Sequence, residues 1–241
     1  MKIRIVKISK RVIFIVVVVL MIMFLVKTFS NIIPVFRFNS EEPIYKGDSE
    51  SKKIAFACNV YWGNEYIPDM LNIFRKNDIK ITFFIGGSWS RDFPELLKMI
   101  YDEGHEIGNH GYNHKDHTKL AFEENKMEII RAEKQIEETT GNKTNLFAPP
   151  SGAYNKDTIK AAKELGYTVI MWSIDTIDWK KPGSQYIIDK VINNSHNGAI
   201  VLMHPVEDTL EALPSIIMGL KAQGYEITNV SEVIANKNNR Q

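Results

Sequence analysis

Two histidines in the middle of the chain have a spacing that suits a metal ion. His110 and His114 stand four residues apart, at the end of the stretch Glu106–His114. This spacing predicts that both imidazoles lie on one face of a helical turn, where a divalent metal ion such as zinc could take them as ligands. Catalytic zinc sites usually add a third protein ligand and a water molecule. The pair therefore predicts part of a metal-assisted hydrolase site.

Other polar residues follow apolar, strand-like runs. His204 ends the run Ala199–His204, and a neutral imidazole there can hand a proton to a leaving amine. Asp178, which precedes the aromatic Trp179, is suited to orient that histidine. Simpler interpretations stay open, because His204 could be a core histidine bonded to a backbone carbonyl and Asp178 could cap a helix.

Strand-like and helical stretches alternate from residue 53 onward, which predicts an α/β fold with a parallel sheet. The expected strands are Lys53–Val60, Lys80–Ile85, Glu106–Asn109, Asn145–Pro149, Thr168–Ile174, Ala199–His204 and Glu226–Asn229. The expected helices are Glu65–Lys76, Pro94–Glu103, Glu123–Thr139, Lys156–Leu165, Gln185–Asn193 and Leu210–Ala222. A closed barrel and an open doubly wound sheet both fit, and in either one functional residues gather at the carboxyl ends of the strands.

The N-terminal part of the chain differs in composition from the rest. Seven basic residues and no acidic residue lie before residue 41, and Val12–Val26 is unbroken in its apolar character. We expect a cytoplasmic basic segment at 1–11, a transmembrane signal-anchor at 12–36, a linker at 37–52 and the folded domain at 53–236. A cleaved signal peptide is the alternative, and both interpretations place the domain on the extracytoplasmic side of the cell membrane.

Charge and cysteine content exclude other kinds of function. All 29 acidic residues lie beyond residue 40, so the domain is mildly acidic and lacks the basic face that a nucleic-acid partner requires. The single cysteine, Cys58, excludes an internal disulfide and lies in an apolar run, where a buried, inert thiol is expected.

Four short motifs, in order, resemble the polysaccharide deacetylase family with a NodB-homology domain (carbohydrate esterase family 4). They are His110-Gly-Tyr-Asn-His114, Pro149-Pro-Ser-Gly152, Asp178-Trp179 and Leu202-Met-His204, and the resemblance spans about Lys53 to Val233. It implies a distorted (β/α)7 barrel and metal-dependent removal of acetyl groups from glycans such as peptidoglycan, chitin or xylan. The stretch Asn59-Val-Tyr-Trp-Gly-Asn-Glu65 is similar to the sporulation-associated branch.

The resemblance assigns expected roles to individual residues. It implies that His110 and His114 bind the metal, and that His204 acts as the acid with Asp178 behind it. Trp179, Ser151, Pro150 and Leu202 are the implied substrate-binding residues, with the Ser151 backbone N–H holding the oxyanion. The expected substrate, and the expected partner, is a cell-wall polysaccharide that contains an amino sugar of the peptidoglycan type.

The first and third motifs depart from the family pattern. Family members carry Thr-Phe-Asp-Asp-Gly at the end of the first strand, where this chain reads Ala57-Cys-Asn-Val-Tyr61. Asn59 therefore occupies the place of the general base and cannot take a proton from water, and Val60 occupies the place of a metal-binding aspartate. Ala148 replaces the arginine that would steady the base. We accordingly expect a divalent metal to be weakly bound or absent.

Three functions are compatible with this sequence. The retained histidines and Asp178 favour, by a small margin, a membrane-tethered deacetylase with weak or altered chemistry that hydrolyses the C–N bond of an N-acetyl group. The joint loss at Asn59, Val60 and Ala148 suggests instead a catalytically impaired glycan-binding relative. A scaffold in spore or envelope assembly is the third possibility.

Overall fold

The computed structural model describes residues 42–238, together with the isolated positions 11 and 21. The folded domain lies within residues 37–241, which form a unit separate from residues 1–36. The expected transmembrane segment at 12–36 lies outside the described residues, apart from Met21. Within the described part of the chain, no helix is both long and apolar enough to cross a membrane.

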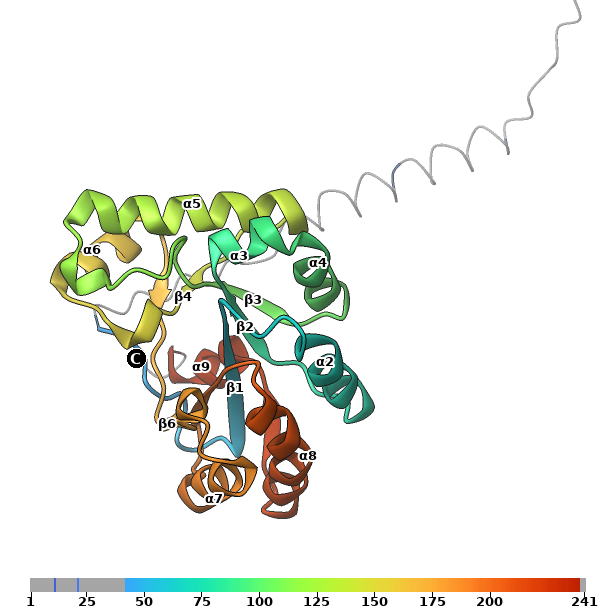
Figure 1. Ribbon diagram of the computed structural model, residues 1–241. Helices are drawn as coiled ribbons and strands as arrows, with labels where there is room; N and C mark the ends of the chain where they lie inside the picture. The colour runs from blue at the N-terminus through green and yellow to red at the C-terminus, as the bar shows by residue number, and fades with distance from the viewer. Residues whose placement is uncertain (1–10, 12–20, 22–41, 239–241) are drawn as a thin grey trace, which may run out of the picture. The chain divides into compact units, whose positions relative to one another are not determined.

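A parallel β-sheet forms the centre of the domain (Figure 1). Its strands are β1 (Lys53–Val60), β2 (Thr82–Ile85), β3 (Glu106–Asn109), β4 (Leu146–Phe147), β5 (Thr168–Val169), β6 (Ile174–Asp175), β7 (Ile200–Met203) and β8 (Glu226–Thr228). They are ordered β5-β4-β3-β2-β1-β7-β6, with β8 paired to the first residues of β1. β1 lies at the centre, which explains why every residue after Lys53 in this strand is buried.

The sheet is curled into an incompletely closed barrel, so the expected distorted (β/α)7 barrel describes its general form. Both of its edges come from one segment, because β5 pairs with β4 whereas β6 pairs with β7. We predicted a single strand at Thr168–Ile174, and that prediction was wrong. The chain ends its pairing with β4 at Val169 and begins to pair with β7 only at Ile174. Between the two short strands, Ile170 instead forms an isolated bridge with Ile44.

Helices surround the sheet, as Figure 1 shows. They are α2 (Ile67–Lys76), α3 (Gly87–Asp92), α4 (Pro94–Asp102), α5 (Phe122–Thr140), α6 (Lys156–Glu164), α7 (Ser184–Asn194), α8 (Glu207–Ala222) and α9 (Val230–Asn238), with short 3-10 helices η1 (His117–Lys119), η2 (Pro150–Gly152) and η3 (Asp178–Lys180). The glycines expected after four of these helices, Gly104, Gly141, Gly166 and Gly224, all have a positive φ, as C-terminal caps require. The sequence analysis did not predict the helices α3 and α9.

Residues 44–48, part of the expected linker, pack against the domain. The backbone N–H of Ile44 donates to the Val169 carbonyl at 2.9 Å, and the N–H of Met171 donates to the Ile44 carbonyl at 2.8 Å. Gly47 donates to the Gly198 carbonyl at 2.8 Å, and Ile44 is only 6% exposed. This part of the stretch at 37–52 therefore packs against the segment that connects β5 to β6.

Successive side chains of β1 belong alternately to two apolar clusters of the interior. Ile54, Phe56, Cys58 and Val60 belong to the large cluster shared with α2, α4, α7 and α8. Ala55 and Ala57 belong to a smaller cluster inside the curled sheet. Successive side chains on a strand point to opposite faces, so Asn59 continues the inner row of small residues. The thiol of Cys58 is fully buried, as predicted, and burial raises its pKa well above the ordinary value.

Candidate functional site

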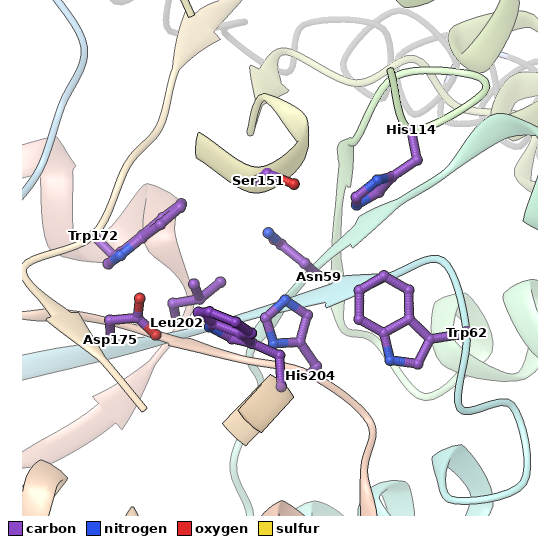
Figure 2. Close-up of a pocket in the computed structure, with 9 residues that line it drawn as sticks. Asn59, Trp62, His114, Ser151, Trp172, Asp175, Leu202 and His204 are labelled. Atoms are coloured by element: carbon purple, nitrogen blue, oxygen red, sulfur yellow. The ribbon is translucent and has the colours of Figure 1, made fainter. Parts of the chain in front are cut away.

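A cavity of about 360 Å³ opens at the carboxyl ends of the strands (Figure 2). Ligand pockets in proteins typically have volumes of about 300–1,000 Å³. Six strands or the loops that follow them supply its walls, so the expected convergence of separate motifs is present. The lining residues are Asn59, Trp62, His114, Ser151, Trp172, Asp175, Trp179, Leu202 and His204.

The histidine pair meets through a loop, and the helical turn that the spacing predicted is absent. His110 directly follows β3, and His114 has a left-handed φ of 52°. Two side chains accept hydrogen bonds from the backbone N–H groups that would otherwise bond within a helix. The Asn109 Oδ1 accepts from the Gly111 N–H at 2.9 Å, and one oxygen of Glu128 accepts from the N–H groups of residues 112 and 113. The two imidazole centroids nevertheless lie 5.2 Å apart.

His110 has the environment of a neutral imidazole with one free nitrogen. Its Nδ1 lies 2.7 Å from the Ala148 carbonyl oxygen, so Nδ1 carries the proton and Nε2 is left as an acceptor. Burial, and then the neighbouring His114, lowers the pKa of His110 well below its ordinary value. Burial also lowers the pKa of His114. Both rings are therefore neutral near neutral pH, and a neutral imidazole is the form that binds metal ions.

The residues around this pair do not complete a catalytic metal site. Val60, at the place of the expected third ligand, is fully buried and belongs to the helix-side core. Among residues 42–238, no group of three His, Cys, Asp or Glu side chains is placed to hold a metal ion. Since catalytic zinc sites usually have three protein ligands, the pair is suited to weak metal binding at most.

His204 and Asp178 form a buried, hydrogen-bonded dyad. The Asp178 Oδ1 lies 2.7 Å from His204 Nδ1, and Oδ2 accepts from the His204 backbone N–H at 2.6 Å. Thr209 donates to the same Oδ2 at 2.7 Å. Burial alone would raise the pKa of Asp178, but these hydrogen bonds and the imidazole charge outweigh it and lower that pKa. The dyad fixes the ring so that Nε2 is available toward the pocket.

The side chain of Asn59 lines the pocket. Its side chain is 4% exposed, and its Oδ1 is buried and unpaired. Figure 2 shows the amide between His114, Ser151 and His204, with its nitrogen toward the cavity. An amide there can donate and accept hydrogen bonds but cannot act as a general base.

Three tryptophans give the pocket an aromatic wall. Trp62 stacks on His204 with ring centroids 5.3 Å apart and an interplanar angle of 12°, and it meets His114 edge-on. Trp179 is 53% exposed. Trp172 packs beside Gly152, where an added Cβ would lie 2.7 Å from the indole and the φ is +66°. Exposed indole faces of this kind are suited to stacking on sugar rings.

The remaining expected site residues are placed in two ways. Leu202, 4% exposed, and Ser151, which is exposed, line the pocket, whereas Pro150 is buried behind it. Asp175 ends β6 and also lines the pocket, with its Oδ1 accepting from the Ile177 N–H at 2.8 Å. The sequence analysis missed Thr209, because no local pattern distinguishes a threonine in the first turn of α8 that bonds a distant carboxylate.

Comparison with protein families gives one matching family model, described as polysaccharide deacetylase, over residues 46–170. An uncharacterised protein, YlxY of Bacillus subtilis, is 44% identical over 80% of this chain. The match spans 60% of YlxY, so this chain corresponds to about three fifths of that relative's length. The peptidoglycan-N-acetylmuramic acid deacetylase PdaA of Bacillus subtilis is 34% identical over 83% of this chain and 78% of its own.

Solved structures of similar fold include proteins with and without activity. Wild-type BA3943 of Bacillus anthracis, described as a CE4 family pseudoenzyme, aligns with a TM-score of 0.79 at 41% identity, over 80% of this chain and 69% of its own. A BA3943 mutant described as having restored enzymatic activity aligns with the same TM-score at 40% identity, over 80% of this chain and 71% of its own.

Proposed function

The chain belongs to the polysaccharide deacetylase family, and we propose that it binds the glycan of cell-wall peptidoglycan without deacetylating it. The observation that carries this proposal is Asn59, an amide at the place of the general base, next to the buried Val60 at the place of a metal ligand. A general base usually contributes about 10²–10⁴-fold in rate. The aromatic pocket is retained while the groups that activate water are not.

Features of the pocket support glycan as the ligand. Trp62 and Trp179 are exposed at 40% and 53%, and both line a cavity of about 360 Å³. The named activities of relatives such as PdaA concern peptidoglycan, and BA3943 provides a similar fold described as a pseudoenzyme. Our sequence reading favoured an enzyme by a small margin, and the incomplete metal site among the described residues reverses that preference.

Sedimentation with purified peptidoglycan tests this proposal. We expect the purified full-length chain to sediment with the insoluble wall, and Trp179→Ala to reduce the bound fraction. Tyr186→Ala is a matched control, because Tyr186 is an exposed aromatic at 44% that lies on α7 and is not among the lining residues. A bound fraction no higher than that of an unrelated protein would refute glycan binding.

Weak deacetylation is the second candidate, and the intact His204–Asp178 dyad favours it. An imidazole held by a buried carboxylate with its other nitrogen facing a pocket is suited to protonate a departing amine. This candidate predicts zinc-stimulated acetate release that His204→Ala abolishes. An acetate signal that survives His204→Ala comes from a contaminating enzyme and does not support it.

We also propose that residues 12–36 tether the domain to the cell membrane on the extracytoplasmic side. The support is the basic start followed by the apolar run Val12–Val26 in the sequence. Fractionation of cells, with protease added to intact protoplasts, tests it. The full-length chain should stay in the membrane fraction and be degraded from outside.

A further inference from the structure

A short segment at the start of the folded domain, residues 44–48, pairs with both sides of the curled sheet, and we call it the strap. Ile44 forms its bridge with Ile170, which directly follows the edge strand β5. Lys46 forms an antiparallel bridge with Ala199, which directly precedes β7, the neighbour of the other edge strand β6. The strap therefore joins the two ends of the sheet, although the sequence predicted a linker at 37–52.

The first residue of the strap lies behind one wall of the pocket. The Met171 N–H, just before Trp172, donates to the Ile44 carbonyl at 2.8 Å. The Ser173 N–H, just after Trp172, donates to the Ile200 carbonyl at 3.0 Å. Ile44 and Trp172 also pack in the same apolar cluster inside the sheet, and Trp172 lines the pocket (Figure 2). The strap thus holds the backbone on one side of this indole, and β7 holds it on the other.

The next residue of the strap contacts a second wall. The phenol oxygens of Tyr45 and Tyr154 lie 2.6 Å apart and share a hydrogen bond. Tyr154 comes two residues after η2, the 3-10 helix that places Ser151 in the pocket. The two walls also meet each other, because an added Cβ at Gly152 would lie 2.7 Å from the Trp172 indole. A shift of the strap is therefore transmitted to both.

The other end of the strap is anchored outside the pocket. The Gly47 N–H donates to the Gly198 carbonyl at 2.8 Å, and the Asp48 N–H donates to the Val233 carbonyl at 3.2 Å. Gly47 lies so close to α9 that an added Cβ would be 2.1 Å from the Val233 carbonyl oxygen. Gly47 is not among the lining residues. A side chain at Gly47 therefore displaces the strap while every lining residue keeps its identity.

We propose that the strap is a positioning element of the glycan-binding pocket, in which Ile44 and Tyr45 hold the walls formed by Trp172 and Ser151. This inference rests on the proposed glycan binding and adds residues outside the pocket to the determinants of affinity. Only molecules whose walls are formed bind the ligand. If a displaced strap leaves the walls formed in about one molecule in ten, the apparent Kd rises about tenfold.

Sedimentation of the full-length chain with purified peptidoglycan, over a range of protein concentrations, measures the apparent Kd. We expect Gly47→Ala to raise it about tenfold or more. Tyr45→Phe removes one hydroxyl and should raise it by about twofold to tenfold, the equivalent of one hydrogen bond. Because Tyr45 is 44% exposed, this second variant decides the question if Gly47→Ala does not fold. A Kd that neither variant changes would overturn the inference while glycan binding survives.

Gly141→Ala is the matched control for these measurements. Gly141 ends α5 with a φ of +75°, and an added Cβ there meets no atom within 4 Å. The substitution strains the backbone as a glycine-to-alanine change does, but it leaves the strap in place. We expect an unchanged Kd, and a Kd raised as much as in Gly47→Ala would show that general destabilisation, and not the strap, lowers the affinity.

Fluorine NMR of the full-length chain labelled with 5-fluorotryptophan tests the positioning without any glycan. The chain has four tryptophans, and Trp172→Phe assigns the Trp172 signal. Gly47→Ala should shift or broaden that signal and leave the signal of Trp89 in place, because Trp89 lies in α3 and is 3% exposed. An unchanged Trp172 signal refutes the positioning role. If the wild-type chain does not sediment with peptidoglycan, glycan binding is refuted, and a shifted Trp172 signal still supports the positioning of the walls by the strap.

Discussion

The buried Asp178 carboxylate should stabilise the whole domain, and Asp178→Ala tests this. Asp178 is 0% exposed and accepts hydrogen bonds from the His204 N–H, from the His204 ring and from Thr209 at 2.6–2.7 Å. The substitution leaves these donors without their partner. Removing one member of a buried, hydrogen-bonded charge pair typically costs about 3–5 kcal/mol, and we expect a loss in that range.

Urea unfolding followed by circular dichroism measures this loss. For a domain of this size, 1 kcal/mol corresponds to about 2–4 °C in Tm, so Asp178→Ala should lower the Tm by roughly 6–20 °C. Thr209→Val, which removes one of the three donors, should cost only about 1 kcal/mol. Asp175→Ala is the matched control, because Asp175 is partly exposed and has one recorded hydrogen bond.

The comparison between the two aspartates decides the interpretation. The dyad is central to the fold if Asp178→Ala costs at least about 2 kcal/mol more than Asp175→Ala, as the partner-removal cost above implies. If both variants lose the same small amount, the hydrogen bonds to Asp178 do not hold the β7 end in place, and our account of how His204 is positioned is wrong.

Further predictions concern the metal pair, the missing base and acid stability. Val60→Asp places a carboxylate in the core, so it should destabilise the domain by about 3 kcal/mol or more. If the new carboxylate reaches His110, zinc at 100 times its Kd should recover about 2.7 kcal/mol. A thermal melt that zinc does not change would show that the carboxylate does not reach His110. In that background Asn59→Asp should raise zinc-dependent acetate release by about 10²–10⁴-fold, because it restores a base; an unchanged rate would place the base elsewhere. Burial, with the charge of Lys80, lowers the pKa of His105 from 6.5 to about 4, so the unfolded chain binds a proton that the folded chain excludes, and stability should fall by up to about 3 kcal/mol between pH 6.5 and pH 4. His105→Gln should reduce that pH dependence in urea titrations, whereas substituting the partly exposed His196 should not.

The sequence was sufficient for the alternation of strands and helices, because apolar runs and C-terminal glycines are local signals. It was insufficient at Thr168–Ile174, where the chain changes partner from β4 to β7. Strand pairing of that kind depends on neighbours far away in the chain. The helix α3 was missed for a similar reason, since Gly87–Asp92 has little apolar periodicity and follows β2 directly.

The candidate site was predictable where a motif names the residue and unpredictable where a contact defines it. His110 and His114 do lie close together, but a loop held by Asn109 and Glu128 brings them together, and no helix does. The spacing correctly predicted that the two imidazoles are neighbours, but it wrongly predicted that a helical turn brings them together. Thr209 entered the site only through its hydrogen bond to Asp178, which no sequence pattern records.

The most direct test measures binding and acetate release in one mixture. The purified full-length chain is incubated with N-acetylated peptidoglycan and zinc, and the bound protein and the free acetate are quantified together. Our account predicts that the chain is bound to the glycan and that acetate does not rise above the level with His204→Ala. Acetate that accumulates over many turnovers and disappears with His204→Ala would contradict the central claim that this member of the family binds glycan without deacetylating it.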